Sequence, residues 1–372
     1  LGKNLKKIDK NFDTKKIMFS EHHFSHAASA FFPSPFDEAI ILNLDGVGEW
    51  ATSTLAIGKK NKIRIISEIN FPHSLGLLYS AFTYYLGFKV NSGEYKLMGL
   101  APYGSPKYEK EILEHLIDLK EDGSFKLNMY YFNYLTGFTM VNSNFEILFK
   151  NKRRIPEKEK LTQFHMDIAS SIQKVTEKII IKMCRYIKRK YKINNLCLSG
   201  GVALNCVANG KILKENIFKN IWIQPASGDA GGSIGAALGY WFHEKNKSRI
   251  LNKRDIMQGS YLGPEYNDHM IQNYLDKNNA VYEKLEEKKL IKTVAKKISE
   301  GKVVGWFQGK LEFGPRALGN RSILADPRNK QMQKNLNLKV KFRESFRPFA
   351  PAIIYEYLEE WFNQKVISPY ML

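Results

Sequence analysis

The chain has 372 residues and carries 57 Lys and Arg against 37 Asp and Glu, a formal net charge of +20 at pH 7. That length is enough for two domains that each bury a core. Its 3 cysteines have no CxxC spacing, which excludes a disulfide framework and a zinc ribbon. No apolar signal segment opens the sequence and no apolar window is long enough to cross a membrane, so we expect a soluble, cytoplasmic protein.

The positive charge is compatible with nucleic acid, a membrane surface or anionic substrates as partners. The basic residues are mostly lysines, spread along the chain among Ile, Asn, Phe and Tyr. Such a mixture is typical of proteins encoded by AT-rich genomes. It favours a general compositional bias plus some phosphate-binding residues over a dedicated nucleic-acid face.

The first ninety residues predict strands and helices in alternation. Short apolar runs at 15–20 and 38–45 indicate buried strands, with a histidine-rich helix between them. Residues 51–69 alternate like a β-hairpin with a polar turn, and 74–88 should form a helix.

The middle of the chain predicts an α/β sheet. A loop over 91–104 and an irregular insertion over 105–160 come before a long amphipathic helix at 161–190. Two strand–glycine–helix units follow, at 194–213 and 220–242, and this alternation is typical of a sheet covered by helices.

A charged segment poor in apolar residues, 243–255, separates this sheet from a second unit. We therefore expect domains at 1–250 and 255–372. The chain begins with Leu1 instead of Met and ends without a closing helix cap, so we expect a piece of a longer protein.

Two histidines and an aspartate suggest a metal site. His22 and His26 are four residues apart and share one face of a helix, whereas His23 points elsewhere. Asp45 follows a buried strand and precedes Gly46, at the carboxyl end where α/β sheets place ligands. Imidazoles with a carboxylate suit iron(II) or zinc. Chance spacing of the histidines and a turn-forming Asp-Gly pair are the alternatives.

Two glycine loops suggest phosphate binding. Gly200 and Gly201 follow one strand and open a helix, and Ser227, Gly228 and Asp229 do the same in the next unit. Backbone N–H groups at helix N-termini bind phosphate, and glycine permits a close approach. Asp229 is also a candidate fourth metal ligand or a magnesium-phosphate contact. The glycines of the second loop could instead form a small face for tight helix packing.

A cluster of basic residues in the second unit suggests an anion pocket, because guanidinium groups held in loops recognise phosphate or carboxylate. The alternative is a structural role, with Glu312 and Glu344 as partners. The cluster stands among Gly, Pro and Phe and comprises Arg316, Arg321, Arg328, Lys341, Arg343 and Arg347.

Six motifs together resemble one family, the O-carbamoyltransferases of the nodulation (NodU), tobramycin and cephamycin type. They occur in order over nearly the whole chain: "EHHFSHAASAFF", "LDGVGEW", "GEYKLMGLAPYG", "LSGGVALN", "SGDAGGSIGAALG" and "FGPRALGNRSILADPR". The resemblance implies an actin/Hsp70-like ATPase-superfamily domain, similar to the threonylcarbamoyl-transferases, followed by part of a YrdC-like α/β domain. It also implies missing strands at the N-terminus and an incomplete C-terminal domain.

The resemblance assigns roles to residues of this chain. It implies iron(II), with zinc as an alternative, on His22, His26, Asp45 and Asp229. It implies that ATP with magnesium and carbamoyl phosphate bind the second domain through Lys341 and Arg343, forming carbamoyl adenylate for attack by an acceptor hydroxyl. The expected nucleotide- and phosphate-binding residues are Gly46, Gly48, Gly200, Gly201, Asn205, Ser227, Gly228, Arg316, Arg321 and Arg347.

Several points stay open at this stage. His73 is a candidate general base, but it could equally be a core residue or a substrate contact. His165, near the start of the predicted long helix, is as compatible with a structural role as with a catalytic one. The acceptor is a hydroxyl of a sugar, an antibiotic or a lipo-oligosaccharide, and a homodimer is an open alternative to a monomer. Rival hypotheses are a tRNA-modifying or tRNA-binding protein and an inactive remnant.

Overall fold

The computed structural model describes residues 1–251, 255–363 and 366–372. The expected domain boundary between residues 250 and 255 falls partly on 252–254, outside the described residues. Below, residues 1–251 are called the first unit and residues 255–372 the second unit.

The first unit is built on one five-stranded mixed sheet with the order β3-β2-β1-β6-β7. β2 pairs antiparallel with both β1 and β3, whereas β1, β6 and β7 run parallel to one another. This mixed α/β architecture confirms the predicted fold class. The strands are β1 (Glu38–Leu44), β2 (Ala51–Lys59), β3 (Lys62–Asn70), β6 (Asn195–Ser199) and β7 (Asn220–Ile223).

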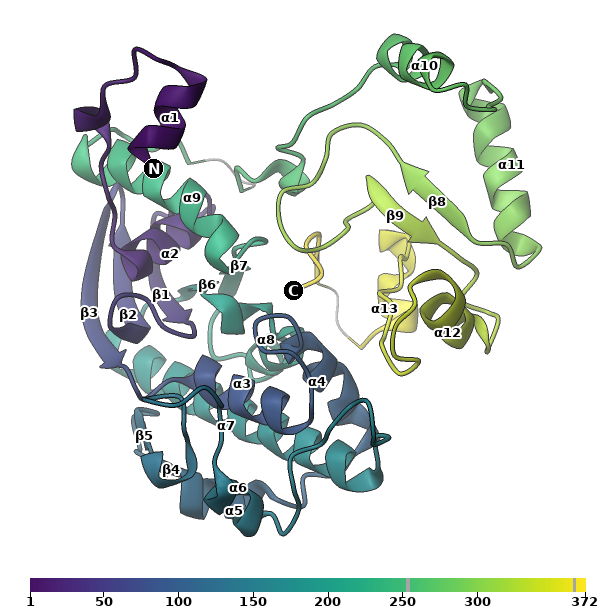
Figure 1. Cartoon of the computed structure of the whole chain (residues 1–372). Helices are drawn as coiled ribbons and strands as arrows, with labels where there is room; N and C mark the ends of the chain where they lie inside the picture. Colours follow the sequence, from purple (N-terminus) through teal and green to yellow (C-terminus); the bar gives the residue numbers. More distant parts are fainter. Residues whose placement is uncertain (252–254, 364–365) are drawn as a thin grey trace.

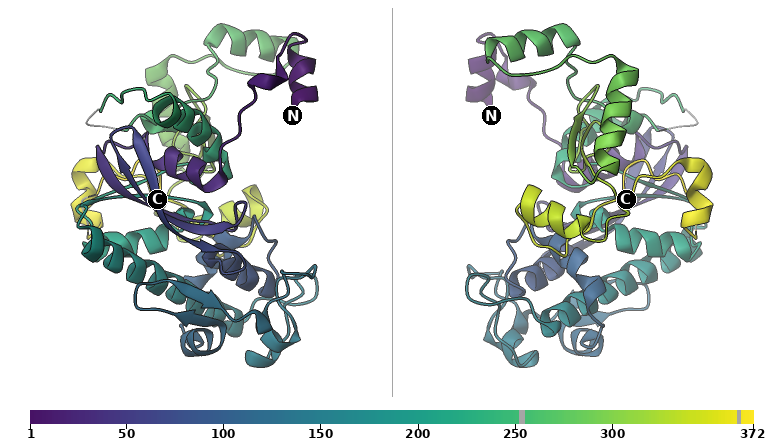
Figure 2. Two further views of the ribbon diagram at one scale, coloured as in Figure 1. Left: turned by 90° about the vertical axis from the view of Figure 1, so that its left-hand side faces the viewer. Right: turned by 90° about the vertical axis from the view of Figure 1, so that its right-hand side faces the viewer.

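Helices cover both faces of this sheet, as Figures 1 and 2 show. In β1, Ile40, Leu42 and Leu44 face one apolar cluster, while Ala39 and Ile41 face another. This alternation follows from the two-residue period of a strand, so both faces of β1 are buried. α2 (His22–Phe31) and α9 (Asp229–Leu238) cover one face; α3 (Leu75–Tyr85), α7 (Gln163–Tyr191) and α8 (Cys206–Lys214) cover the other.

Two local predictions were wrong. Residues 15–20 form no strand, because Met18 and Phe19 are 64% and 87% exposed and pair with no neighbouring strand. Residues 91–104 are not a simple loop, since they contain α4 (Glu94–Leu100). The Glu94 carboxylate accepts hydrogen bonds from Ser80 Oγ and from the backbone N–H of Asn91, which fixes the start of that helix.

The insertion at 105–160 is irregular, as expected, but it is folded and packed. Phe145 and Phe149 lie buried in the core beside Phe82, with ring centroids 5.1 and 5.8 Å from it. Its regular elements are α5 (Glu109–Glu111), β4 (Ile117–Leu119), β5 (Phe125–Leu127) and α6 (Ser143–Leu148).

The second unit has a two-stranded antiparallel sheet and mostly exposed helices. Its elements are α10 (Asp268–Lys277), α11 (Glu287–Ser299), β8 (Val304–Phe307), β9 (Arg321–Leu324), α12 (Met332–Asn335) and α13 (Leu358–Trp361). At the other end of the chain, α1 (Gly2–Ile8) buries no residue and projects from the first unit (Figure 2).

Short 3-10 or π-helical turns complete the described structure. They are η1 (Thr14–Lys16), η2 (Ala101–Tyr103), η3 (Ile112–Leu116), η4 (Met129–Tyr131), η5 (Gly201–Leu204), η6 (Gly239–Glu244), η7 (Gln258–Ser260), η8 (Leu336–Val340) and η9 (Tyr355–Tyr357). Over the described ranges, no helix combines the length and apolar character needed to span a bilayer.

The segment that leaves the first unit is anchored to the end of α2. The Arg249 guanidinium stacks 4.4 Å from the centre of the Phe31 ring. It also donates to backbone carbonyl oxygens at and just after the end of α2 and in the turn between β2 and β3. The carbonyls that it contacts are those of Phe31, Phe32, Ser34, Phe36 and Lys60.

Candidate metal centre and anion-binding residues

The loop after β1 fixes the N-terminal end of α2. The Glu49 carboxylate accepts a hydrogen bond from the backbone N–H of His22, at 3.1 and 3.2 Å from its two oxygens. Glu21, the N-cap residue, makes no side-chain cap bond, so Glu49 takes over that role. A Cβ atom at Gly48 would lie 2.9 Å from the His23 ring, so glycine is needed for this approach.

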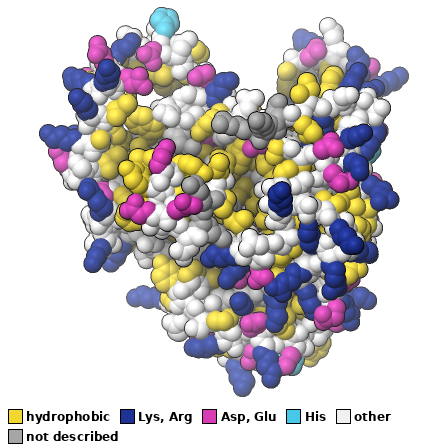
Figure 3. All heavy atoms as spheres, turned by 180° about the vertical axis from the view of Figure 1, so that it is seen from behind, with side chains coloured by type: hydrophobic (Ala, Val, Ile, Leu, Met, Phe, Trp, Pro, Cys, Tyr) yellow, Lys and Arg dark blue, Asp and Glu magenta, His cyan; other side chains and the backbone are white. Residues whose placement is uncertain are grey.

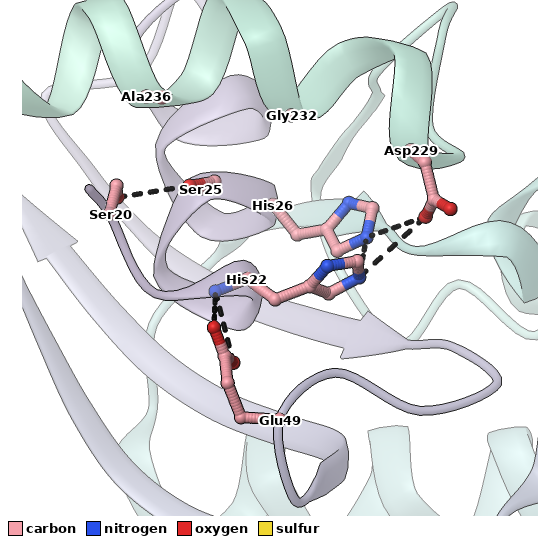
Figure 4. A pocket seen from close by; sticks show the side chains of 8 residues that line it. All are labelled: Ser20, His22, Ser25, His26, Glu49, Asp229, Gly232 and Ala236. Atoms are coloured by element: carbon pink, nitrogen blue, oxygen red, sulfur yellow. Dashed lines mark hydrogen bonds and ion pairs between the residues drawn. The ribbon is translucent and has the colours of Figure 1, made fainter. Parts of the chain in front are cut away.

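Four predicted ligands converge at the carboxyl end of β1. Their ligand atoms all lie within 4.8 Å of one another. His22 Nε2 is 2.9 Å and His26 Nε2 3.3 Å from Asp45 Oδ2, and the two ring nitrogens are 3.0 Å apart. Asp229 Oδ1 lies 3.6 and 3.7 Å from the same ring nitrogens. Figure 4 shows His22, His26 and Asp229 pointing toward one another.

The electrostatics of this cluster favour a cation. Burial by itself raises the pKa of Asp45, but hydrogen bonds from His22, His26 and the Gly201 N–H outweigh it and hold the pKa well below its usual range. The hydrogen bond to Asp45 in turn raises the pKa of His22, although burial opposes it. Asp45 is therefore a buried anion whose charge must be balanced by a proton or a metal ion.

The donor set fits a transition metal. Two imidazole nitrogens 3.0 Å apart must either share a proton or direct their lone pairs at one ion. Two imidazoles with two carboxylates suit iron(II) or zinc. His23, as predicted, points elsewhere: its Nδ1 contacts Thr54 Oγ1 at 3.1 Å, and burial lowers its pKa to about 4.

Close packing of α9 against α2 brings Asp229 to the site. Asp229 is the first residue of α9, and a side chain at Gly235 would collide with the backbone of Ser25. Gly235 and Gly239 therefore do serve tight packing on α2, the alternative left open above, whereas the space at Gly232 is open. They do so while the loop also presents Asp229.

A cavity of about 370 Å³ is lined by three of the four candidate ligands, His22, His26 and Asp229. Its wall on α9 is formed by Gly232 and Ala236, and Ser20 and Ser25, bonded to each other at 2.9 Å, form part of the opposite wall. Glu49 lies at its edge (Figure 4). The sequence analysis did not single out Ser20, Ser25, Glu49 or Ala236. For Glu49, its place four residues after Asp45 in the "DGVGEW" motif was an available signal.

Most residues of the first glycine loop have contacts within the protein. Gly200 has φ of +86°, and a side chain there would collide with Leu44. The Gly201 N–H donates to Asp45 Oδ1 at 2.9 Å. Asn205 is buried, bonds Gln173 and caps α8 through the Ala208 N–H. These contacts hold Asp45 and α8 in place.

The remaining predicted loop residues divide into open and buried positions. No atom lies within 4 Å of a Cβ built at Gly46 or Gly228, so both have the free space that a ligand would need. The side chain of Ser227, by contrast, is fully buried. The whole residue is covered, so Ser227 presents no surface to a ligand in this structure.

The arginines of the second unit are held by protein groups. Arg321 pairs with the buried carboxylate of Glu312 at 2.9 Å. Arg343 donates to Asn337 Oδ1 at 2.6 Å, and Arg347 stacks 4.5 Å from the centre of the Tyr95 ring. Arg316 reaches across to the first unit and donates to the Leu204 carbonyl at 2.9 Å.

The proposed structural partners are in part confirmed. Glu312 does pair with Arg321, whereas Glu344 pairs mainly with Lys96 at 2.7 Å and lies 3.9 Å from Arg347. Arg328 forms a bidentate pair with Asp326. Lys341 is exposed and has no ion pair within the described part of the chain.

His73 lies outside the cavity lining. Its Nδ1 accepts a hydrogen bond from the backbone N–H of Leu127 at 3.1 Å, and burial lowers its pKa. A neutral ring bonded in this way carries its proton on Nε2. The geometry therefore gives His73 a free donor instead of the free acceptor that a general base needs.

The chain belongs to the carbamoyltransferase family. The model of the carbamoyltransferase N-terminus matches residues 2–238, and that of the C-terminus matches residues 295–372. This confirms the resemblance stated above. The motifs that carried it span both matched regions.

Similar curated proteins come from several bacteria. The chain is 59% identical to the uncharacterized protein sll1178 of Synechocystis sp., over 98% of the chain and 59% of that protein. It is 38% identical to the nodulation protein NolNO of Sinorhizobium fredii, over 94% of the chain and 49% of that protein. It is 35% identical to the nodulation protein NolO of Bradyrhizobium diazoefficiens, over 92% of the chain and 60% of that protein. The chain thus spans about half to three-fifths of the length of these relatives.

Among solved structures, HypF of T. kodakarensis is similar to 65% of the chain at 14% identity, and 38% of that structure is covered. The TM-score is 0.34, so this likeness carries no argument about the site.

Proposed function

We propose that the chain forms the transfer centre of an O-carbamoyltransferase that uses carbamoyl phosphate and ATP. Carbamoyl adenylate would be the activated intermediate, and a hydroxyl of a sugar, an antibiotic or a related small molecule the acceptor. One observation carries the proposal. In a chain of the carbamoyltransferase family, two imidazoles and two carboxylates converge beside an open cavity at the carboxyl end of the central strand.

The side chains that would hold iron(II) or zinc are His22, His26, Asp45 and Asp229. When bound, such an ion supplies a positive charge that stabilises anionic oxygens of the reacting group. The chain orients these ligands itself. Gly201 N–H fixes Asp45, and Glu49 fixes the first turn of α2, so the ligand geometry is set before substrate binds.

The proposed transfer step forms one bond to the carbamoyl carbon and breaks another. The acceptor oxygen bonds to the carbonyl carbon of carbamoyl adenylate, and the bond from that carbon to the AMP phosphate oxygen breaks. AMP leaves with the electron pair, and the hydroxyl proton passes to a base. His73 offers no free acceptor nitrogen in this structure, whereas the exposed carboxylate of Glu49 borders the cavity. Within this proposal we therefore assign the role of proton acceptor to the Glu49 carboxylate instead of His73.

The second unit would supply the anion-binding groups for carbamoyl phosphate and for ATP with magnesium. Lys341, exposed and without an ion pair in the described segments, is available to a phosphate. Arg343 is half-buried between Asn337 and the Phe349 ring, 4.8 Å away, which fixes the direction of its guanidinium. The Arg316 bond to Leu204 places this region against the first glycine loop.

The rival nucleic-acid function finds less support. Lysines and arginines form a row along the exposed side of α7, but three of them are paired: Lys178 with Glu109, Lys182 with Glu121 and Arg185 with Glu215. On the face drawn in Figure 3, basic and acidic side chains are interspersed. A nucleic-acid surface would instead need unpaired cations in a continuous stripe.

The test is an assay of AMP release from ATP that depends on both carbamoyl phosphate and an alcohol acceptor, made with the intact gene product. We expect release in the parent protein and its loss in His22→Ala, with ATP binding retained. Lys292→Ala, on the exposed helix α11, is the matched control and should keep the parent rate. AMP release that is unchanged in His22→Ala would contradict the proposal.

A further inference from the structure

A second cavity, of about 440 Å³, lies at the seam between the two units. The first unit contributes Tyr103 from η2, together with Leu161 and Met166 at the start of α7. The second unit contributes residues 330–334 and 345–346. The volume is in the range of small-molecule sites, which often occur where two domains meet. None of its lining residues belongs to the candidate metal centre.

One side of this cavity is apolar and fixed. Leu161, Met166 and Phe346 pack against the main hydrophobic core. The rings of Tyr103 and Phe346 meet edge to face, with centroids 6.3 Å apart, and the Tyr103 hydroxyl donates to the Phe346 carbonyl at 3.2 Å. These contacts hold two aromatic rings at the wall without filling the space in front of them.

The other side of the cavity is cationic. Lys330 and Lys334 are exposed and line the cavity, and no described carboxylate lies within ion-pair distance of either. No acidic residue appears in the lining. Gln333, between them, donates to the carbonyls of Phe346 and Arg347 and so ties this turn to the aromatic wall. Lys178 and Lys182 on α7, by contrast, have acidic partners.

We propose that this seam cavity binds a small aromatic phosphate, either a nucleoside monophosphate or an aryl phosphate. Two unpaired ammonium groups match the charge of a phosphate monoester, which is close to −2, better than that of a single carboxylate. The two rings and the aliphatic side chains match a planar apolar body of the ligand. Because residues of both units line the cavity, a bound ligand holds them together. The inference does not depend on the proposed transfer reaction.

The test is isothermal titration calorimetry with the full chain at low ionic strength, in the presence of EDTA. The probes are AMP and phenyl phosphate, with inorganic phosphate and adenosine as comparisons. We expect saturable binding of at least one aromatic phosphate, at least about tenfold tighter than that of inorganic phosphate or adenosine. AMP binding alone identifies a nucleotide site, and equal binding of phenyl phosphate identifies an aryl phosphate site.

Variants locate the site. Lys330→Ala/Lys334→Ala should weaken binding about tenfold or more, and Phe346→Leu should weaken the aromatic probes but not inorganic phosphate. The matched control Lys292→Ala/Lys297→Ala removes the same charge from α11 and should leave binding unchanged. Asp45→Ala should also leave it unchanged.

Three results would overturn the inference. The first is no saturable binding of either aromatic probe. The second is equal affinity for inorganic phosphate, which would leave the apolar wall without a role. The third is binding that is lost in Asp45→Ala but kept in Lys330→Ala/Lys334→Ala, which would place the ligand at the metal centre.

Discussion

The candidate metal centre and the arginine-rich second unit differ in whether their charged side chains are paired within the protein. At the candidate metal centre, side chains from three distant parts of the chain point at one position, and no described lysine or arginine pairs with either carboxylate. In the second unit, guanidinium groups are bound by nearby carboxylates, amides or rings. Acidic side chains that converge without a lysine or arginine partner are a candidate binding site. Charged side chains that are already paired within the protein form a scaffold, and such a scaffold offers a ligand only its unpaired groups.

The largest expected effect is a difference in metal affinity between variants of two candidate ligands, Asp45 and Asp229. Asp45→Asn should weaken binding of iron(II) or zinc by at least about 100-fold, because loss of an outer-shell partner alone costs about 10–100-fold. Asp229→Asn should cost about tenfold, since its side chain is 81% exposed and its oxygen lies farther from the imidazoles. Competition titration with a chromophoric chelator measures both. The exposed Asp118→Asn is the control, and equal losses for Asp45 and Asp229 would contradict this ranking.

The second prediction concerns the scaffold of the second unit. Glu312→Gln should lower the free energy of unfolding by about 2 kcal/mol, because the carboxylate accepts three backbone N–H groups and pairs with Arg321. Glu344→Gln, which disturbs a partly exposed pair with Lys96, should cost less than about 1 kcal/mol. Urea unfolding followed by circular dichroism compares them. If Glu344→Gln proved the more destabilising, Glu312 would not organise this loop.

The third prediction tests whether the first glycine loop is scaffold. Asn205→Ala should lower the free energy of unfolding by about 1–2 kcal/mol, because it removes the cap of α8 and the bond to Gln173. Lys211→Ala, on the exposed side of the same helix, serves as the control. Thermal unfolding monitored by calorimetry is the measurement. Unchanged stability combined with weaker ATP binding would return Asn205 to the nucleotide-binding role predicted from the sequence.

The smallest expected effect is a pH dependence at the start of α7. The His165 Nδ1 accepts a hydrogen bond from the Thr162 N–H at 3.0 Å, and burial lowers the pKa of His165 below its ordinary 6.5. The unfolded chain therefore takes up this proton first, so the stabilisation is complete above pH 6.5 and declines as the pH falls toward the lowered value. The measurement is urea unfolding at a series of pH values.

His165→Gln provides the control for this pH dependence. Glutamine at the third helical position can accept the same backbone hydrogen bond without titrating. The variant should therefore lose the part of the pH dependence that lies just below pH 6.5, the ordinary pKa of the replaced histidine. Identical profiles for parent and variant would mean that His165 does not contribute.

The sequence was most informative where spacing and strand position combine. The four-residue spacing of His22 and His26 and the place of Asp45 after an apolar run predicted the convergence, because helix and strand geometry fix where such side chains point. Asp229 was a candidate fourth ligand because it opens a helix after the second glycine loop, and the family resemblance implied the same role. Glu49 was not singled out, since its bond to the His22 N–H depends on how the loop after β1 folds back onto α2.

The sequence was least informative about partners distant in the chain. Nothing near Arg316 indicates Leu204, and nothing near Arg347 indicates the Tyr95 ring, because these contacts arise only when the two units pack together. The strand predicted over residues 15–20 was wrong for a related reason. An apolar run becomes a strand only where a neighbouring strand completes its hydrogen bonds, and Phe19 has no such neighbour.

The most direct test of the metal centre is anomalous diffraction from crystals of the chain grown with iron(II) under anaerobic conditions. Data collected on both sides of the iron absorption edge locate the ion without reference to activity. We expect one strong peak about 2.0–2.2 Å from His22 Nε2, His26 Nε2 and a carboxylate oxygen of Asp45. Ordered, protein-bound iron at any other place, or an iron-free cluster in crystals that bind iron elsewhere, would contradict it.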